Sequence, residues 1–375
     1  GAGGGEHNGS GLPRYAIGLH ADLSGPSAAQ GRAQENGLRL AVEEFNAAPD
    51  RPCDLAVVTE DDAGDPVAAT AAADRLAADA SVIAVVGPTT DAAGEAAVPR
   101  YDEVLLPLLA LSVGSFATVL GTHPALLHAR PPTFFVGLSL AVSVVERTGA
   151  TTLGFVDDRT GDMDSAQMVR AAMQAADSLA VATVPRVVSA GTEDFGPVIG
   201  ELAAEGAQAV VYGGPAGGAA HLATGLAAAG FAGTAIGGPA VLDPAFLAAA
   251  GEAAEGWLVV APYIDPAATA ETREFADLYR GRFDADPPYG AAEAYDAAWL
   301  LAGAVTALGD GGEVAREALG ARLRESTHDG VGKALAFDPQ DGGFLVSDEN
   351  TGVYLYRVEG GAFRYLGAAP LPPLG

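Results

Sequence analysis

Polar and small residues follow two apolar segments in the stretch 85–115, VVGPTTDAAGEAAVPRYDEVLLPLLALSVGS. The first apolar segment, Ile83 to Val86, ends in Gly-Pro and two threonines, and the second, Leu105 to Leu111, ends in Ser-Val-Gly-Ser. Hydroxyls, a carboxylate and main-chain amides of this kind hydrogen bond to a small polar molecule. The candidate binding residues of this stretch are Thr89, Thr90, Asp91, Ser112, Gly114 and Ser115.

The same stretch predicts a β-α-β unit, with the two apolar segments as strands and a helix of small residues between them. In an open parallel sheet, ligands bind outside the carboxyl ends of the strands, because loops and helix N-termini present unpaired N–H groups there. We therefore expect the six residues to lie at one edge of a sheet. For Asp91 an N-cap of the following helix is an equal alternative, since Asp is favoured at that position.

Catalytic and metal-binding patterns are missing from the sequence. It contains no G-x-S-x-G elbow, and the stretch 212–218, YGGPAGG, lacks the Lys-Ser/Thr of a phosphate loop, so it indicates a turn and a helix start. The histidines show no zinc spacing, and His20 and His123 are interpreted as surface or loop residues. The acidic residues at 60–65 lack calcium-loop spacing and indicate a loop and a helix cap. The sequence thus predicts no catalytic residue, no metal and no cofactor.

Composition narrows the classes of partner. The 375 residues carry a formal charge of −28, with 48 acidic and 20 basic side chains, which argues against nucleic acid as a partner. Such a surface is self-repelling and favours a monomer. No uninterrupted apolar run approaches the roughly 20 residues that a membrane span needs. Cys53 is the single cysteine, so a disulfide framework is excluded.

From Tyr15 onward, short apolar runs alternate with longer alanine-rich segments, which is typical of the α/β class with a parallel sheet covered on both faces. The pattern pauses near Pro131-Pro132 and then repeats, which predicts two similar lobes. Along the second half we expect an extended segment at 134–136, a helix at 138–147, a short strand within 330–338, and a hairpin of 353–358 with 362–366 turning on Gly360-Gly361.

At this point the chain resembles a known family, the type I periplasmic solute-binding proteins, and in particular their leucine/isoleucine/valine-binding branch. The segments that carry the resemblance are 17–31 (IGLHADLSGPSAAQG), 60–66 (EDDAGDP), 85–115 and 250–260 (AGEAAEGWLVV). Shorter stretches at 211–214 (VYGG) and 226–234 (LAAAGFAGT) add weaker support. The likeness runs from Tyr15 to about Leu366 and rests on the order and spacing of the segments.

The resemblance implies two Rossmann-like lobes, joined by a hinge of three crossovers, with a ligand cleft between them. Lobe 1 is expected at 14–133 and 261–331, and lobe 2 at 134–260 and 332–366. Residues 1–13 are expected to be a flexible linker and 367–375 a loose tail. Closure of the lobes on a ligand would be a shift from an open to a closed population.

Several positions that contact the ligand in members of the family carry different residues in this chain. The serine that holds the ligand carboxylate in amino-acid-binding members falls on Asp91, which favours a cationic, amine-bearing or hydroxylated ligand because like charges repel. The next contacts, a carbonyl and a threonine, fall on Ser112 and Gly114, with Ser115 as a replacement hydroxyl. At the remaining positions, Gln30 stands where the family has a shielding aromatic, and Asp162 and Pro215 stand where it has two tyrosines. Pro239 stands where the family has the acid that grips an ammonium group.

Tyr289 and Glu293 are further ligand-binding candidates, because they stand at the start of the long helix expected at 291–308; a solvated helix N-terminus is the alternative. With Asp91, Gly114 and Pro239 replacing the groups that grip both charges of an amino acid, we expect free branched-chain amino acids to bind poorly.

The leading hypothesis is a non-enzymatic, extracytoplasmic protein that captures a small polar solute (amino-acid-like, amine or polyol) and delivers it to an ABC permease. A second hypothesis is the external ligand-sensing domain of a membrane receptor such as a Ser/Thr kinase, with a fused signalling domain. A third is a two-domain α/β enzyme, which needs a glycine fingerprint whose spacing Gly18, Gly25 and Gly31 do not provide.

Overall fold

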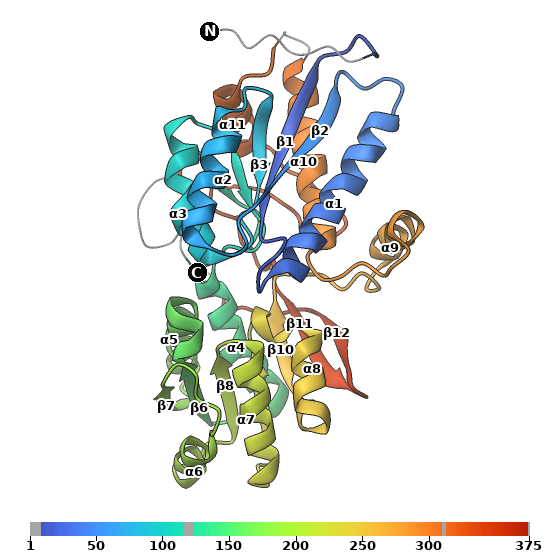
Figure 1. The fold of residues 1–375 in the computed structure, drawn as a ribbon. Helices are drawn as coiled ribbons and strands as arrows, with labels where there is room; N and C mark the ends of the chain where they lie inside the picture. The colour runs from blue at the N-terminus through green and yellow to red at the C-terminus, as the bar shows by residue number, and fades with distance from the viewer. Residues whose placement is uncertain (1–8, 116–122, 310–312, 374–375) are drawn as a thin grey trace. The chain divides into compact units, whose positions relative to one another are not determined.

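A computed structural model describes residues 9–115, 123–309 and 313–373, which belong to two compact units (Figure 1). Unit 1 comprises Gly1–Arg130 and Tyr263–Leu345, and unit 2 comprises Pro131–Pro262 and Val346–Gly375. The chain therefore passes from one unit to the other three times. The third passage follows Leu345 rather than residue 331, because the segment 332–345 pairs with unit 1, for example through the N–H of His128 to the carbonyl of Gly342.

Unit 1 contains a five-stranded sheet in the order β2-β1-β3-β4-β5, and every neighbouring pair is parallel. The strands are β1 (Arg14–Ala21), β2 (Asp54–Asp61), β3 (Val82–Val86), β4 (Leu108–Ala110) and β5 (Leu126–His128). The central strand β3, VIAVV, is buried throughout, as expected of a β-branched run covered on both faces. The strand order reverses direction between β1 and β3, which is the position where α/β sheets bind ligands.

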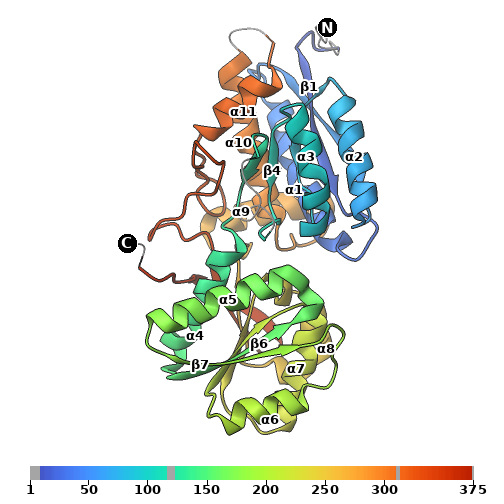
Figure 2. The same cartoon turned by 90° about the vertical axis from the view of Figure 1, so that its left-hand side faces the viewer.

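The helices of unit 1 cover both faces of this sheet (Figures 1 and 2). They are α1 (Ala28–Ala47), α2 (Pro66–Ala78), α3 (Asp91–Glu103), α9 (Ala270–Phe283), α10 (Ala291–Gly309) and α11 (Arg316–Arg324). α1 packs against α10, and α2 packs against α3. The predicted helix start at Asp65 is confirmed, since the Asp65 carboxylate accepts the N–H of Ala68 at 2.9 Å and Pro66 needs no N–H partner.

Unit 2 contains a seven-stranded sheet in the order β12-β11-β10-β9-β8-β6-β7. The strands are β6 (Thr152–Asp158), β7 (Ala182–Val188), β8 (Ala209–Gly213), β9 (Thr234–Gly237), β10 (Leu258–Ala261), β11 (Tyr354–Glu359) and β12 (Ala362–Ala368). β6 to β10 are parallel, whereas β11 runs antiparallel to both β10 and β12. The predicted hairpin is confirmed, with Gly360 and Gly361 at φ of 60° and 75°, where glycine carries no steric penalty.

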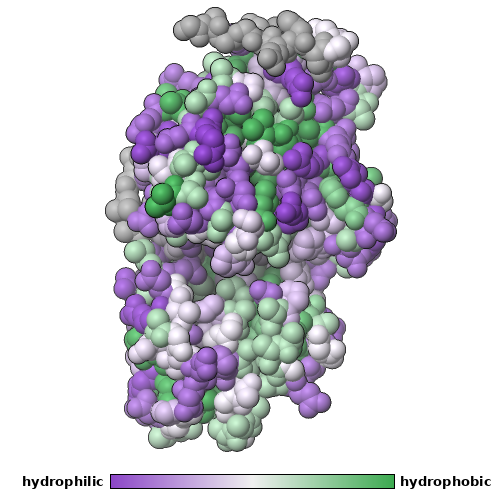
Figure 3. All heavy atoms as spheres, viewed as in Figure 1, coloured by the Kyte–Doolittle hydropathy of each residue, from purple (hydrophilic) through white to green (hydrophobic). Residues whose placement is uncertain are grey.

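The helices of unit 2 are α4 (Thr133–Thr148), α5 (Asp162–Ser178), α6 (Gly196–Ala204), α7 (Ala216–Ala228) and α8 (Pro244–Ala250). α4 and α5 share one face of the sheet and supply much of its core, while α7 packs with α8. Figure 3 shows pale green, alanine-rich surface where α7 and α8 lie, and hydrophilic side chains spread over the visible faces of both units.

Three local predictions are wrong. Residues 134–136 are not extended but form the first turn of α4, because Pro131 and Pro132 precede the helix and fix its entry. Residues 330–338 form no strand but only the isolated pairs His328 with Leu335 and Phe337 with Phe344. The tail is not loose from residue 367, since β12 continues to Ala368 and the buried Ala369 donates its N–H to Val353.

Within the part of the chain that the structure describes, no helix combines the length and the apolar character that crossing a membrane would require.

Candidate functional site

Polar groups from three elements meet at the carboxyl edge of the unit 1 sheet, between the ends of β1 and β3. Thr89 follows β3 and is 3% exposed; its Oγ1 accepts the N–H of Asp22 at 3.1 Å and donates to Oε1 of Gln34 at 3.3 Å. The Ser112 hydroxyl, after β4, donates to the Thr89 carbonyl at 2.7 Å and accepts from Nε2 of Gln34 at 2.9 Å. The structure therefore brings the predicted residues Thr89 and Ser112 together, through a glutamine of α1 that the sequence did not single out.

Asp91 is the first residue of α3, and its carboxylate crosses to the loop after β4. Oδ1 accepts the N–H of Gly114 at 2.9 Å and of Ser115 at 3.5 Å, while Oδ2 accepts the Ser115 hydroxyl at 2.7 Å. The N-cap of α3 is Thr90, whose Oγ1 accepts the N–H of Ala93 at 3.2 Å. The N-cap alternative for Asp91 is therefore wrong, because Thr90 fills that position.

The Tyr263 hydroxyl links further groups at the same end of unit 1. Gln30, in the first turn of α1, donates Nε2 to this hydroxyl at 2.9 Å. Burial raises the pKa of Tyr263 to about 12, and the nearby Arg130 guanidinium opposes the rise whereas the carboxylates of Glu293 and Asp91 add to it. Arg130, which follows β5 and is 4% exposed, also donates to the Ser112 carbonyl at 3.2 Å. Side chains from α1 and from the end of β5 thus contact the phenol, while the carboxylates of Glu293 and Asp91 act on it through their charge.

Glu293 belongs to a buried charge cluster, not to a solvated helix N-terminus. Its Oε2 accepts the N–H of Ile264 at 3.2 Å and lies 3.7 Å from Nζ of Lys333. Burial raises the pKa of Glu293 and lowers that of Lys333, and each charge opposes the shift of the other. One helical turn later, Asp296 accepts the N–H groups of Val331 and Gly332, at 2.8 Å each. The cluster ties the segments 263–264 and 330–333 to α10.

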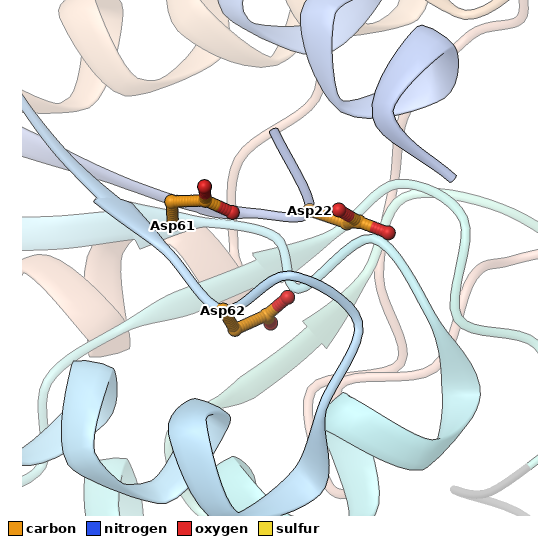
Figure 4. Close-up of side chains that lie close together, drawn as sticks. All are labelled: Asp22, Asp61 and Asp62. Atoms are coloured by element: carbon orange, nitrogen blue, oxygen red, sulfur yellow. The ribbon is translucent and has the colours of Figure 1, made fainter. Parts of the chain in front are cut away.

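Three carboxylates near the ends of β1 and β2, those of Asp22, Asp61 and Asp62, have oxygens within 4.8 Å of one another (Figure 4). Their oxygens already accept protein donors: Asp22 accepts three N–H groups of residues 24–27, Asp61 those of Leu23 and Ala63, and Asp62 that of Gly64. The group orders two adjacent loops, as the sequence predicts for the acidic residues at 60–65.

The candidates of unit 2 lie at different places along its strand ends. Asp162 begins α5, is exposed, and adopts φ of 51°, which is uncommon for a residue other than glycine. The Tyr212 hydroxyl donates to Asp158 at 2.8 Å, and the Pro215 carbonyl, before α7, lies 3.0 Å from the same hydroxyl oxygen. Pro239 begins a short 3-10 helix. No hydrogen bond joins these three positions among the described residues.

Tyr289 precedes α10 and is half-buried; burial raises its pKa. Four residues of this region were not predicted from the sequence, namely Gln34, Arg130, Tyr263 and Lys333. A signal existed for two of them: Gln34 is four residues after Gln30 on one helix face, and Arg130 comes three residues after the short apolar run 125–127. No local pattern pointed to Tyr263 or Lys333, because each lies far in the sequence from the residues that it contacts.

Comparison with solved structures shows the same architecture. The branched-chain amino acid transporter substrate binding protein LivJ from Streptococcus pneumoniae, in complex with isoleucine, is 22% identical over 96% of this chain and 100% of its own, with a TM-score of 0.81. A solute binding protein of an ABC transporter from R. palustris, in complex with benzoate, is 22% identical over 96% and 97%, with a TM-score of 0.77.

A third structure, a putative branched-chain amino acid ABC transporter from Rhodospirillum rubrum, is 25% identical over 94% of this chain and 100% of its own, with a TM-score of 0.76. No curated protein matches the chain. The family model described as periplasmic binding protein matches residues 14–362, almost the whole chain. This chain is therefore a member of the periplasmic binding protein family.

Proposed function

We propose that this protein binds a small polar solute at the carboxyl ends of its parallel strands and delivers it to an ABC import permease, without chemical conversion of the solute. The observation that carries the proposal is the convergence of Gln30, Arg130 and Tyr263 with the ends of β3 and β4 in unit 1. Polar groups held rigidly by neighbouring elements are suited to orient a ligand. The family membership and the ABC transporter proteins of the same fold support this role.

The solute is proposed to be amino-acid-like, an amine or a polyol. The ligand contacts proposed in unit 1 are Gln30, Ser112 and Tyr289 together with Tyr263, and those in unit 2 are Asp162, Pro215 and Pro239. Phe134 and Met163, at the starts of α4 and α5, are 38% and 52% exposed, so unit 2 offers apolar surface near its strand ends.

The place and partners follow from the same role. We propose an extracytoplasmic location, a monomer, and a permease as the protein partner. A fused membrane signalling domain is the alternative partner, and the importer is preferred because proteins with this fold are named as ABC transporter components. If the same gene encodes a signalling domain, a role in sensing would replace the proposed role in import.

Thermal-shift screening against amino acids, amines, polyols and aromatic acids, followed by calorimetry, tests solute binding. We expect at least one class to raise the unfolding temperature. Gln30→Ala and Tyr263→Phe should then weaken binding by about three- to tenfold, the equivalent of one hydrogen bond. His221→Ala, an exposed change in unit 2, serves as the control and should leave affinity unchanged. If no class of solute raises the unfolding temperature, the proposal is overturned.

A further inference from the structure

A hollow of about 490 Å³ lies in unit 1, where α10, the end of α11 and the segment 326–328 meet. The two helices pack against each other (Figure 2). The volume falls within the roughly 300–1,000 Å³ of small-molecule pockets. None of the residues proposed above to contact the imported solute borders this hollow. It is therefore a separate candidate site.

α10 gives the hollow an aromatic wall beside an open space. Trp299 borders it and is half-buried; its ring packs edge-on against those of Phe45 and Tyr295, with centroids 6.3 and 6.5 Å apart. Gly303 borders it four residues later, and a Cβ at Gly303 would meet no atom within 4 Å. An indole held by neighbouring rings is suited to pack against a planar, apolar group of a ligand.

The opposite wall carries one positive and one negative side chain. Arg322 and Glu325 both border the hollow, three residues apart, a spacing at which opposite charges on a helix often pair. Within the described part of the chain, neither side chain forms an ion pair or a hydrogen bond, with the other or with a third residue. Both charges are therefore available to a ligand.

The segment 326–328 is held in place by its own hydrogen bonds. The Ser326 hydroxyl donates to the Arg322 carbonyl at 2.6 Å, and His328 exchanges two main-chain hydrogen bonds with Leu335, at 2.9 Å each. Burial lowers the pKa of His328, although the Asp329 carboxylate opposes the shift, so the imidazole is neutral at pH 7. The charges that border the hollow are then those of Arg322 and Glu325.

We propose that this hollow is a second small-molecule site and that it takes a free amino acid with an aromatic side chain. Arg322 binds the carboxylate of the ligand, Glu325 binds its ammonium group, and its ring packs against Trp299. A guanidinium and a carboxylate form charge-assisted hydrogen bonds, which are stronger than neutral ones. The site lies within unit 1 and does not rest on the proposed function.

Fluorine NMR of protein labelled with fluorotryptophan tests the site, with L-phenylalanine as the probe. The chain has two tryptophans, Trp257 and Trp299, and Trp257→Phe assigns their two signals. We expect phenylalanine to shift the Trp299 signal saturably, because the ligand ring lies against that indole. If the Trp299 signal does not shift, or shifts without saturation, the proposal is overturned.

Probes that lack one charge test the two charged residues. Arg322→Gln should weaken binding of phenylalanine about tenfold and leave that of phenylalaninamide, which has no carboxylate, unchanged. Glu325→Gln should weaken phenylalanine to a similar extent and leave N-acetylphenylalanine, which has no ammonium group, unchanged. Arg273→Gln, an exposed change in α9, is the control and should bind phenylalanine as the wild type does. Equal affinity of wild type, Arg322→Gln and Glu325→Gln for phenylalanine would overturn these contacts.

Filling the hollow provides a test that keeps both charges. Gly303→Leu places a side chain in the open space and should abolish the shift of the Trp299 signal. Gly281→Leu is the matched control, because Gly281 is also an exposed helix glycine of unit 1 at which a Cβ would meet no atom within 4 Å. A shift that persists in Gly303→Leu would place the probe elsewhere and overturn the site. None of the substituted residues is a proposed contact of the imported solute, so such a failure leaves the proposed function standing.

Discussion

His20 illustrates how a single residue changes its role once its neighbours are known. From the sequence alone it is interpreted as a surface or loop residue, but it is fully buried in β1. Its Nδ1 lies 2.8 Å from the Tyr101 hydroxyl, and its Nε2 lies 2.8 Å from Oδ2 of Asp62. The surface interpretation is wrong, because a buried imidazole is stable when both ring nitrogens have partners, and these partners come from α3 and from the loop before α2.

Asp296 provides a prediction about pH. Burial raises its pKa to about 6 from the usual 3.8, although the N–H groups of Gly332 and Val331 oppose the rise. The folded state therefore holds the proton more tightly than the unfolded state does between pH 4 and 6. The contribution of Asp296 to stability is present below pH 4 and is lost as the pH rises through 6, by up to about 3 kcal/mol.

Urea unfolding of wild type and Asp296→Asn from pH 3.5 to 7.5 measures this contribution. As the pH rises across this range, the unfolding free energy of Asp296→Asn should increase relative to that of the wild type. Asp50→Asn, an exposed change, should run parallel to the wild type. If the difference in unfolding free energy between wild type and variant does not change across this range, burial of Asp296 does not make stability depend on pH.

At the scale of elements, the helices of unit 1 predict opposite effects for two glycines. Gly37 lies in α1, and a Cβ there would overlap the carbonyl oxygen of Ala291 and approach Cβ of Ala294 to 3.1 Å. Gly303 lies in α10, where a Cβ would meet no atom within 4 Å. The first glycine allows α1 to pack closely on α10, while the second only weakens its own helix.

Gly37→Ala should therefore lower the unfolding free energy by about 1–3 kcal/mol through overpacking, and Gly303→Ala should raise it by about 0.5–1 kcal/mol through helix propensity. Urea unfolding at constant pH checks both, with each variant serving as the control for the other. Tolerance of Gly37→Ala would contradict the close packing of α1 against α10, and destabilisation by Gly303→Ala would contradict the open surroundings of that position.

At the scale of the whole molecule, the charge of −28 predicts a dependence on salt. Repulsion among 48 acidic groups destabilises the folded protein, and added salt screens it. Exposed ion pairs, such as Arg186 with Glu201 and Glu205, oppose this effect, since salt weakens them too. Each such pair contributes at most about 1 kcal/mol, so the repulsion should dominate.

We therefore expect the unfolding temperature to rise by several degrees between 10 and 300 mM NaCl, at about 1 °C for each kcal/mol gained by a chain of this length. KCl should reproduce the shift, which separates screening from specific binding of sodium. A fall in the unfolding temperature with either salt would mean that the exposed ion pairs outweigh the repulsion.

Prediction from sequence succeeded where local pattern and tertiary environment agree. The buried run of β3, the Asp65-Pro66 start of α2 and the glycine turn of β11 and β12 each carry a local physical signal, so the structure has them where the pattern places them. β5 and the first turn of α4 were missed, because a three-residue strand is too short to show a period and the two prolines of 131–132 suggested an extended chain.

The sequence by itself determined the α/β class, the two units and the sheet edge where Thr89, Asp91 and Ser112 gather, because hydrophobic period and strand-end chemistry are encoded within short segments. Only the tertiary structure decided which other groups of the protein these residues contact. Asp91 accepts donors of the loop after β4, Tyr263 meets Gln30 of α1, and Glu293 meets Lys333. These contacts join residues up to 233 positions apart, and hydrogen bonding at such separations depends on how the elements pack rather than on any local pattern.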